Sequence, residues 1–414
     1  MNATLMPTCR FCAQPLRQTL VDLGRTPLAN SYLEPGQLST PEPQYPLHAR
    51  VCPACRLVQV DNVAAPSEIF GHYAYFSSFA ASWVAHAKNF AVMAAERWRL
   101  GPDSLVVEVA SNDGYLLRHF IDMTIPVLGI EPAANVAQAA HDQGVPTEVA
   151  FFGRDTAQRL KAQGVQADLL VGNNVFAHVP DINDFVAGFG IILKPDGVIS
   201  LEFPHLLQLI KGTQFDTIYH EHFSYLSLLA TEKVFAAHGL RVFDVTELPT
   251  HGGSLRIMAC RDTSRAHAEG AGLAKVRHDE AAAGFDRDEG YAGFEPRVRA
   301  LRDALLAFLR TAKADGKQVA CYGAAAKGNT LLNYCGIGTE LIEYVVDLSP
   351  HKQGRYLPGS RLPIHMPAKL AETQPDYVLI LPWNLKDEIV GQMAHIRDWG
   401  GRFVVAVPSL TVLH

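Results

Sequence analysis

The chain has 414 residues, of which 48% are hydrophobic and 19% are charged, so it has a globular composition and room for about two or three domains. Its formal net charge is −6 and no Lys/Arg block stands out, which argues against a nucleic-acid partner. The sequence shows no apolar run of about 20 residues and no signal-peptide pattern. We therefore expect a cytoplasmic protein without a membrane partner and, since nothing argues for an obligate oligomer, a monomer.

Four of the seven cysteines form two CxxC pairs near the N-terminus, Cys9 with Cys12 and Cys52 with Cys55. Two such pairs have the ligand spacing of a four-thiolate Zn²⁺ site, which is closed and therefore structural. We predict a zinc-binding lobe over residues 1–72. Two redox pairs or unligated thiols are the alternative.

Strand and helix patterns alternate over residues 73–262. We expect helices at 82–99, 116–121 and 133–143, one ending near Phe185, and one that Ser227 caps. The expected strands are 105–109, 127–130, 167–172, 197–202, 241–247 and 254–260. This alternation predicts an α/β domain with a mostly parallel sheet.

The rest of the chain divides into a helical connection and a second alternating domain. Residues 263–315 are charged and Ala-rich with helical spacing. Over 316–414 we expect strands at 318–322, 344–347, 377–381 and 402–405. A small-residue turn at 323–329 is expected to precede a helix that starts near Thr330, so its amides and Lys327 favour a phosphate. Close helix–strand packing is the alternative reason for small residues there.

A turn of small residues follows the first strand of the alternating region, from Glu108 through Asn112 to Gly114. Such a turn lets a cofactor approach the backbone, but it is not GxGxxG, which weakens a dinucleotide interpretation. The second strand ends in Glu131, whose carboxylate can accept hydrogen bonds from ribose hydroxyls. This combination is typical of class I S-adenosylmethionine sites. A solvated acid and a plain turn are the alternative.

The run Tyr219-His220-Glu221-His222 combines four groups that can donate, accept or hold a proton. It predicts proton abstraction, with a polar seam between domains as the alternative. His220 is the member that we expect to be structural.

The chain resembles, over nearly its whole length, the sugar C-methyltransferases that act on nucleotide-linked deoxy-keto-sugars. The resemblance rests on the four cysteines and on motifs of seven to ten residues that begin at Glu108, Gly172, Tyr219 and Tyr322. It implies a zinc-binding β lobe, a class I methyltransferase Rossmann-like domain and a second, Rossmann-like C-terminal domain that holds the nucleotide diphosphate. The implied cofactors are S-adenosylmethionine and structural Zn²⁺.

The resemblance also implies roles for particular residues. His222 is the implied base, with Tyr219, Glu221 and His178 at the same pocket, and either Tyr73 or Tyr75 is implied to close over the sugar. Judged without the family, His178 is a core or loop histidine. The implied cofactor residues are Glu108, Ala110, Asn112, Gly114, Tyr115, Leu116, Glu131, Pro132, Asn173 and Asn174. The implied substrate residues are Tyr75, Ser77, Ser78, Gly323, Ala324, Lys327, Asn329, Trp383 and Asn384.

The predicted reaction is methylation of a nucleotide-linked 4-keto-deoxysugar, with dTDP the expected nucleotide and C-3 the expected carbon. Its product would be a branched-chain sugar for a natural product, such as an antibiotic, or for a surface polysaccharide. Removing the proton next to a ketone gives the nucleophilic carbon that accepts a methyl group. The alternatives are an O- or N-methyltransferase, a zinc-ribbon RNA methyltransferase, an NAD-dependent sugar enzyme and a non-catalytic nucleotide-sugar binding module.

Overall fold

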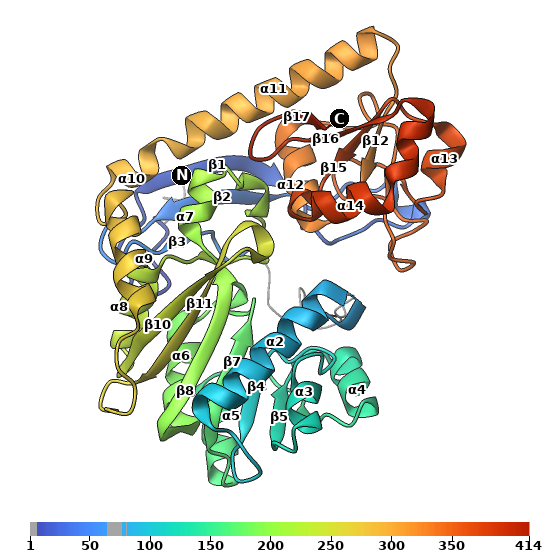
Figure 1. Ribbon diagram of the computed structural model, residues 1–414. Helices are drawn as coiled ribbons and strands as arrows, with labels where there is room; N and C mark the ends of the chain where they lie inside the picture. The colour runs from blue at the N-terminus through green and yellow to red at the C-terminus, as the bar shows by residue number, and fades with distance from the viewer. Residues whose placement is uncertain (1–5, 64–76, 80, 414) are drawn as a thin grey trace.

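The structure, a computed structural model, describes residues 6–63, 77–79 and 81–413. Within them the chain builds three sheets joined by helices (Figure 1). Tyr73 and Tyr75 lie outside the described residues. No helix in the described ranges is long and apolar enough to cross a membrane.

The N-terminal lobe is a four-stranded sheet in the order β1-β2-β3-β9. Its strands are all antiparallel and are β1 (Gln18–Thr26), β2 (Tyr45–Val51), β3 (Val58–Gln59) and β9 (Ser224–Tyr225). A short 3-10 turn, η1 (Pro35–Gln37), lies between β1 and β2. The strand β9 comes from the segment directly after His222, so the lobe is completed by residues from the middle of the chain. The sequence analysis did not predict this strand.

The central sheet has seven strands in the order β10-β11-β8-β7-β4-β5-β6. The strands β4 to β8 are parallel, and β11 is antiparallel to both of its neighbours. The strands are β4 (Val106–Val109), β5 (Val127–Ile130), β6 (Thr147–Glu148), β7 (Ala167–Asn173), β8 (Leu193–Pro204), β10 (Leu240–Leu248) and β11 (Ser254–Arg261). The expected strands are present, β8 starts four residues earlier than expected, and the short edge strand β6 was not expected.

Helices cover both faces of the central sheet because alternate strand residues are apolar on both sides. Val106 and Leu169 pack with Phe90 of α2, whereas Val107 and Leu170 pack with the opposite core. The helices are α2 (Ala81–Trp98), α3 (Leu117–Asp122), α4 (Ala134–Asp142), α5 (Arg154–Ala162), α6 (Ile182–Ile192), α7 (Leu206–Lys211) and α8 (Leu228–Ala236), with the 3-10 turns η2 (Ser77–Phe79), η3 (Phe176–His178), η4 (Phe215–Thr217) and η5 (Thr250–Gly252).

The C-terminal sheet has the order β14-β13-β12-β15-β16-β17 and is parallel except for β17. Its strands are β12 (Val319–Tyr322), β13 (Val345–Val346), β14 (Ile364–His365), β15 (Tyr377–Ile380), β16 (Arg402–Val405) and β17 (Thr411–Leu413). The helices are α12 (Ala326–Cys335), α13 (Lys369–Thr373) and α14 (Lys386–Gln392), with η6 (Trp383–Leu385) and η7 (Ala394–Trp399). The expectation that the first helix starts near Thr330 is wrong: it starts at Ala326, so Lys327 and Asn329 are helical. The edge strands β14 and β17 were not expected.

Three helices connect the central and C-terminal sheets: α9 (Ala271–Ala282), α10 (Glu289–Ala292) and α11 (Phe294–Ala314). In Figure 1, α11 runs along the N-terminal lobe towards the C-terminal sheet. Its buried residues Val298, Leu305 and Leu309 belong to one core that contains both Leu47 of β2 and Val345 of β13. The lobe and the C-terminal sheet therefore share a hydrophobic core, which fixes how they lie against each other.

Helix α8 begins at two caps, one local and one remote. Ser227 Oγ accepts a hydrogen bond from the Ala230 amide, as its position before the helix predicted. The buried carboxylate of Glu280, from α9, accepts the amides of Leu228 (2.6 Å) and Leu229 (2.8 Å) and the ring Nε2–H of His205 (2.8 Å). This carboxylate thus ties α9 to the start of α8.

We predict that Glu280→Ala lowers the free energy of unfolding by about 3–5 kcal/mol, since it leaves two amides and a histidine without their buried acceptor. Urea unfolding followed by circular dichroism measures the change. The exposed Glu343 provides a control, because Glu343→Ala should change stability by no more than about 0.5 kcal/mol. A Glu280→Ala protein as stable as this control contradicts the prediction.

Candidate functional site

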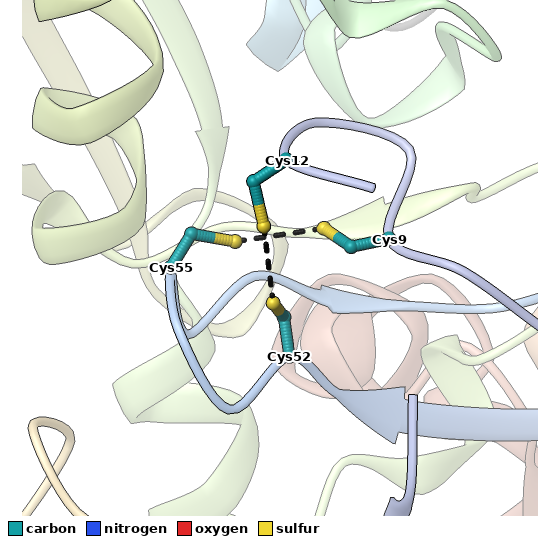
Figure 2. A group of neighbouring side chains, drawn as sticks. All are labelled: Cys9, Cys12, Cys52 and Cys55. Atoms are coloured by element: carbon teal, nitrogen blue, oxygen red, sulfur yellow. Dashed lines mark hydrogen bonds between the residues drawn. The ribbon is translucent and has the colours of Figure 1, made fainter. Parts of the chain in front are cut away.

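The four cysteines of the N-terminal lobe converge on one point (Figure 2). All four sulfur atoms lie within 4.8 Å of one another, and the Sγ distances are 3.5 Å for Cys9 to Cys55 and 3.4 Å for Cys12 to Cys52. Sulfurs about 2.3 Å from a tetrahedral Zn²⁺ lie at nearly this separation. Gln59 Nε2 also donates a hydrogen bond to Cys9 Sγ at 3.2 Å, which suits a thiolate. The donor set fits a structural Zn²⁺.

The small-residue turn after β4 has the backbone shape of a cofactor cradle. Ala110, Asn112 and Gly114 all have positive φ (54°, 51° and 79°). A Cβ on Gly114 would lie 2.7 Å from a methyl of Val145, so only glycine fits there. Leu116 is fully buried behind the turn.

Two buried carboxylates flank this turn. Glu108 is fully buried, and burial raises the pKa of its carboxyl group well above the usual value. Glu131 accepts the backbone amides of Asn112 (3.0 Å) and Ala133 (2.9 Å), so it holds the turn as well as facing it. Burial raises the pKa of Glu131 too, and Pro132 follows it at the surface of the site.

The residues predicted at the end of β7 lie at the same edge of the sheet as the turn. Asn173 Nδ2 donates to the hydroxyl of Tyr115 at 3.2 Å, and Asn174 Nδ2 donates to His251 Nε2 at 2.9 Å. Ser77 and Ser78, predicted to bind substrate, instead donate their amides to the side chains of Asn112 (2.8 Å) and Asp113 (3.1 Å). The structure therefore places both serines against the cofactor turn.

The run Tyr219–His222 is an irregular segment between η4 and β9, and it brings three of the predicted catalytic residues together. The Tyr219 hydroxyl lies 2.8 Å from His222 Nε2, and the rings of His178 and His222 have centroids 4.7 Å apart. His178 Nδ1 donates to the backbone carbonyl of Glu221 at 2.8 Å. His220 points elsewhere, with its Nε2 bonded to the carbonyl of Pro46 in β2.

The hydrogen bonds of His222 fix its tautomer. Its Nδ1 lies 2.9 Å from the carbonyl oxygen of Thr217, which can only accept, so Nδ1 carries the hydrogen. Burial and the neighbouring His178 hold the pKa of His222 well below its usual value. Burial likewise lowers the pKa of His178 to about 4. At neutral pH His222 is therefore a neutral ring whose Nε2 lone pair meets the Tyr219 hydroxyl.

The carboxyl group of Glu221 accepts hydrogen bonds from a residue of the N-terminal lobe. Asn30 Nδ2 lies 2.7 and 2.9 Å from its two carboxyl oxygens. Burial, only partly offset by this hydrogen bond, raises the pKa of Glu221 to about 7. The zinc-binding lobe therefore supplies a hydrogen-bond donor to the run Tyr219–His222.

The predicted substrate residues of the C-terminal domain surround the start of α12. Gly323 has φ 89° and lies against Pro382, where a Cβ would not fit. Ala324 donates its amide to Asp347 Oδ2 at 2.7 Å. Asn329 is buried and donates to the carbonyl of Ala29, so its amide binds the N-terminal lobe. Lys327 Nζ lies 2.6 Å from Asn384 Oδ1.

The structure adds residues that the sequence analysis missed. His251 has φ 55° between β10 and β11, and its ring lies edge-on to Trp83, 5.4 Å between centroids. The fully buried Glu202 accepts hydrogen bonds from His86 (2.8 Å), Thr250 (2.8 Å) and Arg256 (2.5 Å) and so fixes the loop before His251. In the sequence, only the histidine within Thr250–Gly253 indicated a possible functional residue. The partners of His251 and Glu202 could not be recognised, because they come from separate elements.

Comparison with known families agrees with this arrangement. Residues 9–70 match a family model described as a zinc-binding domain, residues 86–245 match a methyltransferase domain, and residues 249–408 match a C-methyltransferase C-terminal domain. The chain is 38% identical over 405 residues to the C-methyltransferase NovU of Streptomyces niveus, which covers 98% of this chain and 96% of that protein.

Solved methyltransferase structures resemble a smaller part of the chain. The S-adenosylmethionine-dependent methyltransferase of Clostridium acetobutylicum is 10% identical, with 44% of this chain and 91% of that chain covered and a TM-score of 0.34. Magnesium protoporphyrin IX methyltransferase of Synechocystis, with S-adenosylmethionine bound, is 14% identical over 43% of this chain and 77% of that chain, with a TM-score of 0.32. The family matches and the sheet order confirm the predicted fold class.

Removal of one thiolate tests the metal site. Cys12→Ser should reduce zinc from one ion per chain to a small fraction of that, because three thiolates hold the ion less tightly. Atomic emission on the purified protein measures the ratio. Cys335→Ser removes a buried thiol from α12 and should leave one ion per chain. Equal zinc in the two variants contradicts the four-thiolate site.

The raised pKa of Glu221 predicts how the stability of the protein depends on pH. Its folded pKa of about 7 exceeds the unfolded value of about 4.3, so the folded state holds the extra proton between these limits. This contribution to stability is full below pH ~4 and is lost as pH rises through ~7, at up to about 1.4 kcal/mol per pH unit. Glu221→Gln should therefore gain stability relative to the parent as pH rises from 5 to 8. Urea unfolding at each pH measures the difference, and parallel curves would contradict it.

Proposed function

Because this chain belongs to the family of S-adenosylmethionine-dependent C-methyltransferases with a zinc-binding domain, we propose that it methylates a nucleotide-linked 4-keto-deoxysugar, with dTDP as nucleotide and C-3 as the carbon. The chain is thus an enzyme that uses S-adenosylmethionine and carries structural zinc. The sugar, the carbon and the residue roles are the proposed part.

One observation carries the proposal: the neutral His222 presents Nε2 to the hydroxyl of Tyr219 at 2.8 Å. Transfer to carbon needs a base for the proton next to the ketone, and a neutral imidazole beside a phenol can take it. In the proposed step the C–H bond breaks and the proton passes to the Tyr219–His222 pair. The electron pair of that bond moves towards the keto oxygen.

His178 and Glu221 are proposed to support this pair. The ring of His178 lies against that of His222, and its Nδ1–H holds the carbonyl of Glu221 in place. Glu221 is close to half protonated at neutral pH, so it can exchange a proton with solvent between turnovers. His220 is proposed to be structural, since it bonds to β2.

The cofactor is proposed to lie along the turn from Glu108 to Leu116, with Glu131, Pro132, Asn173 and Asn174 around it. The cradle at Gly114 and the buried acids supply the close backbone approach and the hydrogen-bond acceptors that an adenosine needs. S-adenosylmethionine, when bound, supplies the electrophilic methyl group.

Four parts of the chain are proposed as working units: the zinc-binding lobe at 1–72, the methyltransferase domain at 73–262, the helical connection at 263–315 and the nucleotide-sugar domain at 316–414. The shared core of the lobe and the C-terminal sheet supports a sugar held between them. An O- or N-methyltransferase remains the second candidate, but it has no need of a base for a carbon acid.

The proposal predicts that the enzyme exchanges the proton next to the ketone of a dTDP-4-keto-deoxysugar in D₂O, and methylates that carbon when S-adenosylmethionine is added. His222→Ala should slow the exchange by about 10²–10⁴-fold because the general base is lost, while cofactor binding stays within about twofold. Proton NMR measures exchange, and calorimetry measures binding.

His278, exposed on α9, gives the matched control: His278→Ala should exchange at the parent rate. Methylation of oxygen or nitrogen alone, with no exchange by the parent enzyme, overturns the proposed reaction. Exchange at the parent rate by His222→Ala overturns the assignment of the base.

A further inference from the structure

Lys327 lies in a setting unlike that of a surface phosphate ligand. It is the second residue of α12, its Nζ donates to Asn384 Oδ1 at 2.6 Å, and it lies 4.9 Å from the ring centre of Trp383. Asp216, which is fully buried, adds a negative charge that favours the ammonium. Burial is the larger effect and lowers the pKa of Lys327. The ammonium is therefore largely desolvated, which strengthens its electrostatic interactions.

The contacts of Trp383 connect the site of this cation with His222. The indole Nε1–H donates to Asp216 Oδ2 at 2.7 Å, and the next residue, Thr217, accepts the hydrogen bond from His222 Nδ1 at 2.9 Å. Trp383 and His222 thus hold two neighbouring residues of the same turn. The ammonium over Trp383 is one of the charges that lower the pKa of His222.

A second loop brings His251 to the same place. Gly252 follows His251 and lies so close to Trp383 that no Cβ fits between them. Burial, and next the positive charge of Lys327, lower the pKa of His251 to about 4. The cation over Trp383 therefore lies close enough to His222 and His251 to act on both electrostatically.

The turn before α12 is poorly suited to a diphosphate. The amide of Gly323 is used by the Val346 carbonyl, and the amide of Ala324 by the carboxylate of Asp347. The Asp347 carboxylate would repel a phosphate there, and Lys352, 3.4 Å from it, already pairs with it. The expectation that Lys327 and this turn together hold a phosphate therefore has little support.

The proposed reaction is favoured by a hydrogen-bond donor or a positive charge at the keto oxygen of the sugar. As the C–H bond breaks, negative charge develops on the keto oxygen, and a fixed donor there lowers the barrier. The neutral rings of His178, His222 and His251 carry no charge to offer. Arg256 is already hydrogen-bonded to the carboxylate of Glu202. Among the described side chains assembled around His222, this leaves Lys327.

We propose that Lys327 is a catalytic residue whose ammonium donates a hydrogen bond to the keto oxygen of the sugar and stabilises the enolate. This assignment rests on the proposed function. The α-proton goes to the Tyr219–His222 pair and its electron pair to the keto oxygen, which the ammonium holds. When the new carbon–carbon bond forms with the methyl group of the cofactor, the C=O bond is restored and S-adenosylhomocysteine is released.

The test separates an enolate ligand from a phosphate ligand. Lys327→Met is assayed for α-proton exchange in D₂O at saturating dTDP-4-keto-deoxysugar with S-adenosylhomocysteine present, and for binding of dTDP alone by calorimetry. We expect the exchange rate at saturation to fall about 10²–10³-fold and the Kd of dTDP to stay within about twofold. Lys327→Arg, which keeps the charge, should recover part of the exchange.

Lys317→Met, which removes an exposed lysine just before β12, serves as the control and should exchange at the parent rate. Exchange at saturation within threefold of the parent in Lys327→Met overturns the proposal, and a tenfold weaker Kd for dTDP would then identify a phosphate ligand. Unchanged cofactor binding and melting temperature exclude misfolding as the cause of a slow variant. If the parent enzyme itself shows no exchange, the proposed function fails instead, whatever Lys327 does.

Discussion

The turn from Asp216 to His222 is held by hydrogen bonds from all three sheet-containing parts of the chain, and the site depends on this arrangement. Asn30 of the N-terminal lobe binds the carboxylate of Glu221, and Trp383 of the C-terminal domain binds that of Asp216. His178, at the end of the central sheet, binds the Glu221 carbonyl. Each part contributes at least one partner, so the geometry of the proposed base exists only in the assembled molecule.

In the proposed mechanism this dependence gives the zinc ion an indirect role, because the lobe that it stabilises supplies a hydrogen-bond partner to Glu221. A lobe of a single four-stranded sheet has too little apolar surface to fold firmly alone, and thiolate ligation supplies the missing free energy. The same lobe takes β9 from the segment after His222 as its fourth strand and sends Asn30 to Glu221. The metal therefore stabilises a lobe that binds Glu221 within the run Tyr219–His222 and pairs with the strand directly after that run.

Local patterns in the sequence predicted most of the central fold because strands and helix caps depend on neighbouring residues. The strand ends, the Ser227 cap and the two CxxC pairs all have signatures within a few positions. The start of α12 was misplaced because the run of alanines and glycine reads equally as turn or helix. The pairing of β3 with β9 could not be predicted, since two-residue strands far apart in the chain leave no periodic signal.

The site shows the same division between local and long-range information. The run Tyr219–His222 was recognisable from the sequence, because its titratable residues are adjacent. The structure shows that His220 bonds to β2, whereas His222 contacts Tyr219. His251 had no such signal, because its place beside Trp83 and Asn174 follows from a loop with φ 55° whose anchor is the buried Glu202. Residues that act through partners on other elements become visible only when the chain is folded.

The charges of the site explain why its histidines and its lysine have different tasks. Three rings share a poorly solvated region with one ammonium, so protonating any ring would place a second positive charge beside it, at an energy that low local polarity increases. The rings therefore stay neutral and able to accept a proton, while Asp216 favours the charged form of the lysine against the larger effect of burial. In the proposed mechanism, transfer of the α-proton to the Tyr219–His222 pair creates that second cation, and the negative charge of the enolate formed in the same step offsets both positive charges. The arrangement thus opposes protonation of the base by water and favours protonation by a substrate that leaves a negative charge behind.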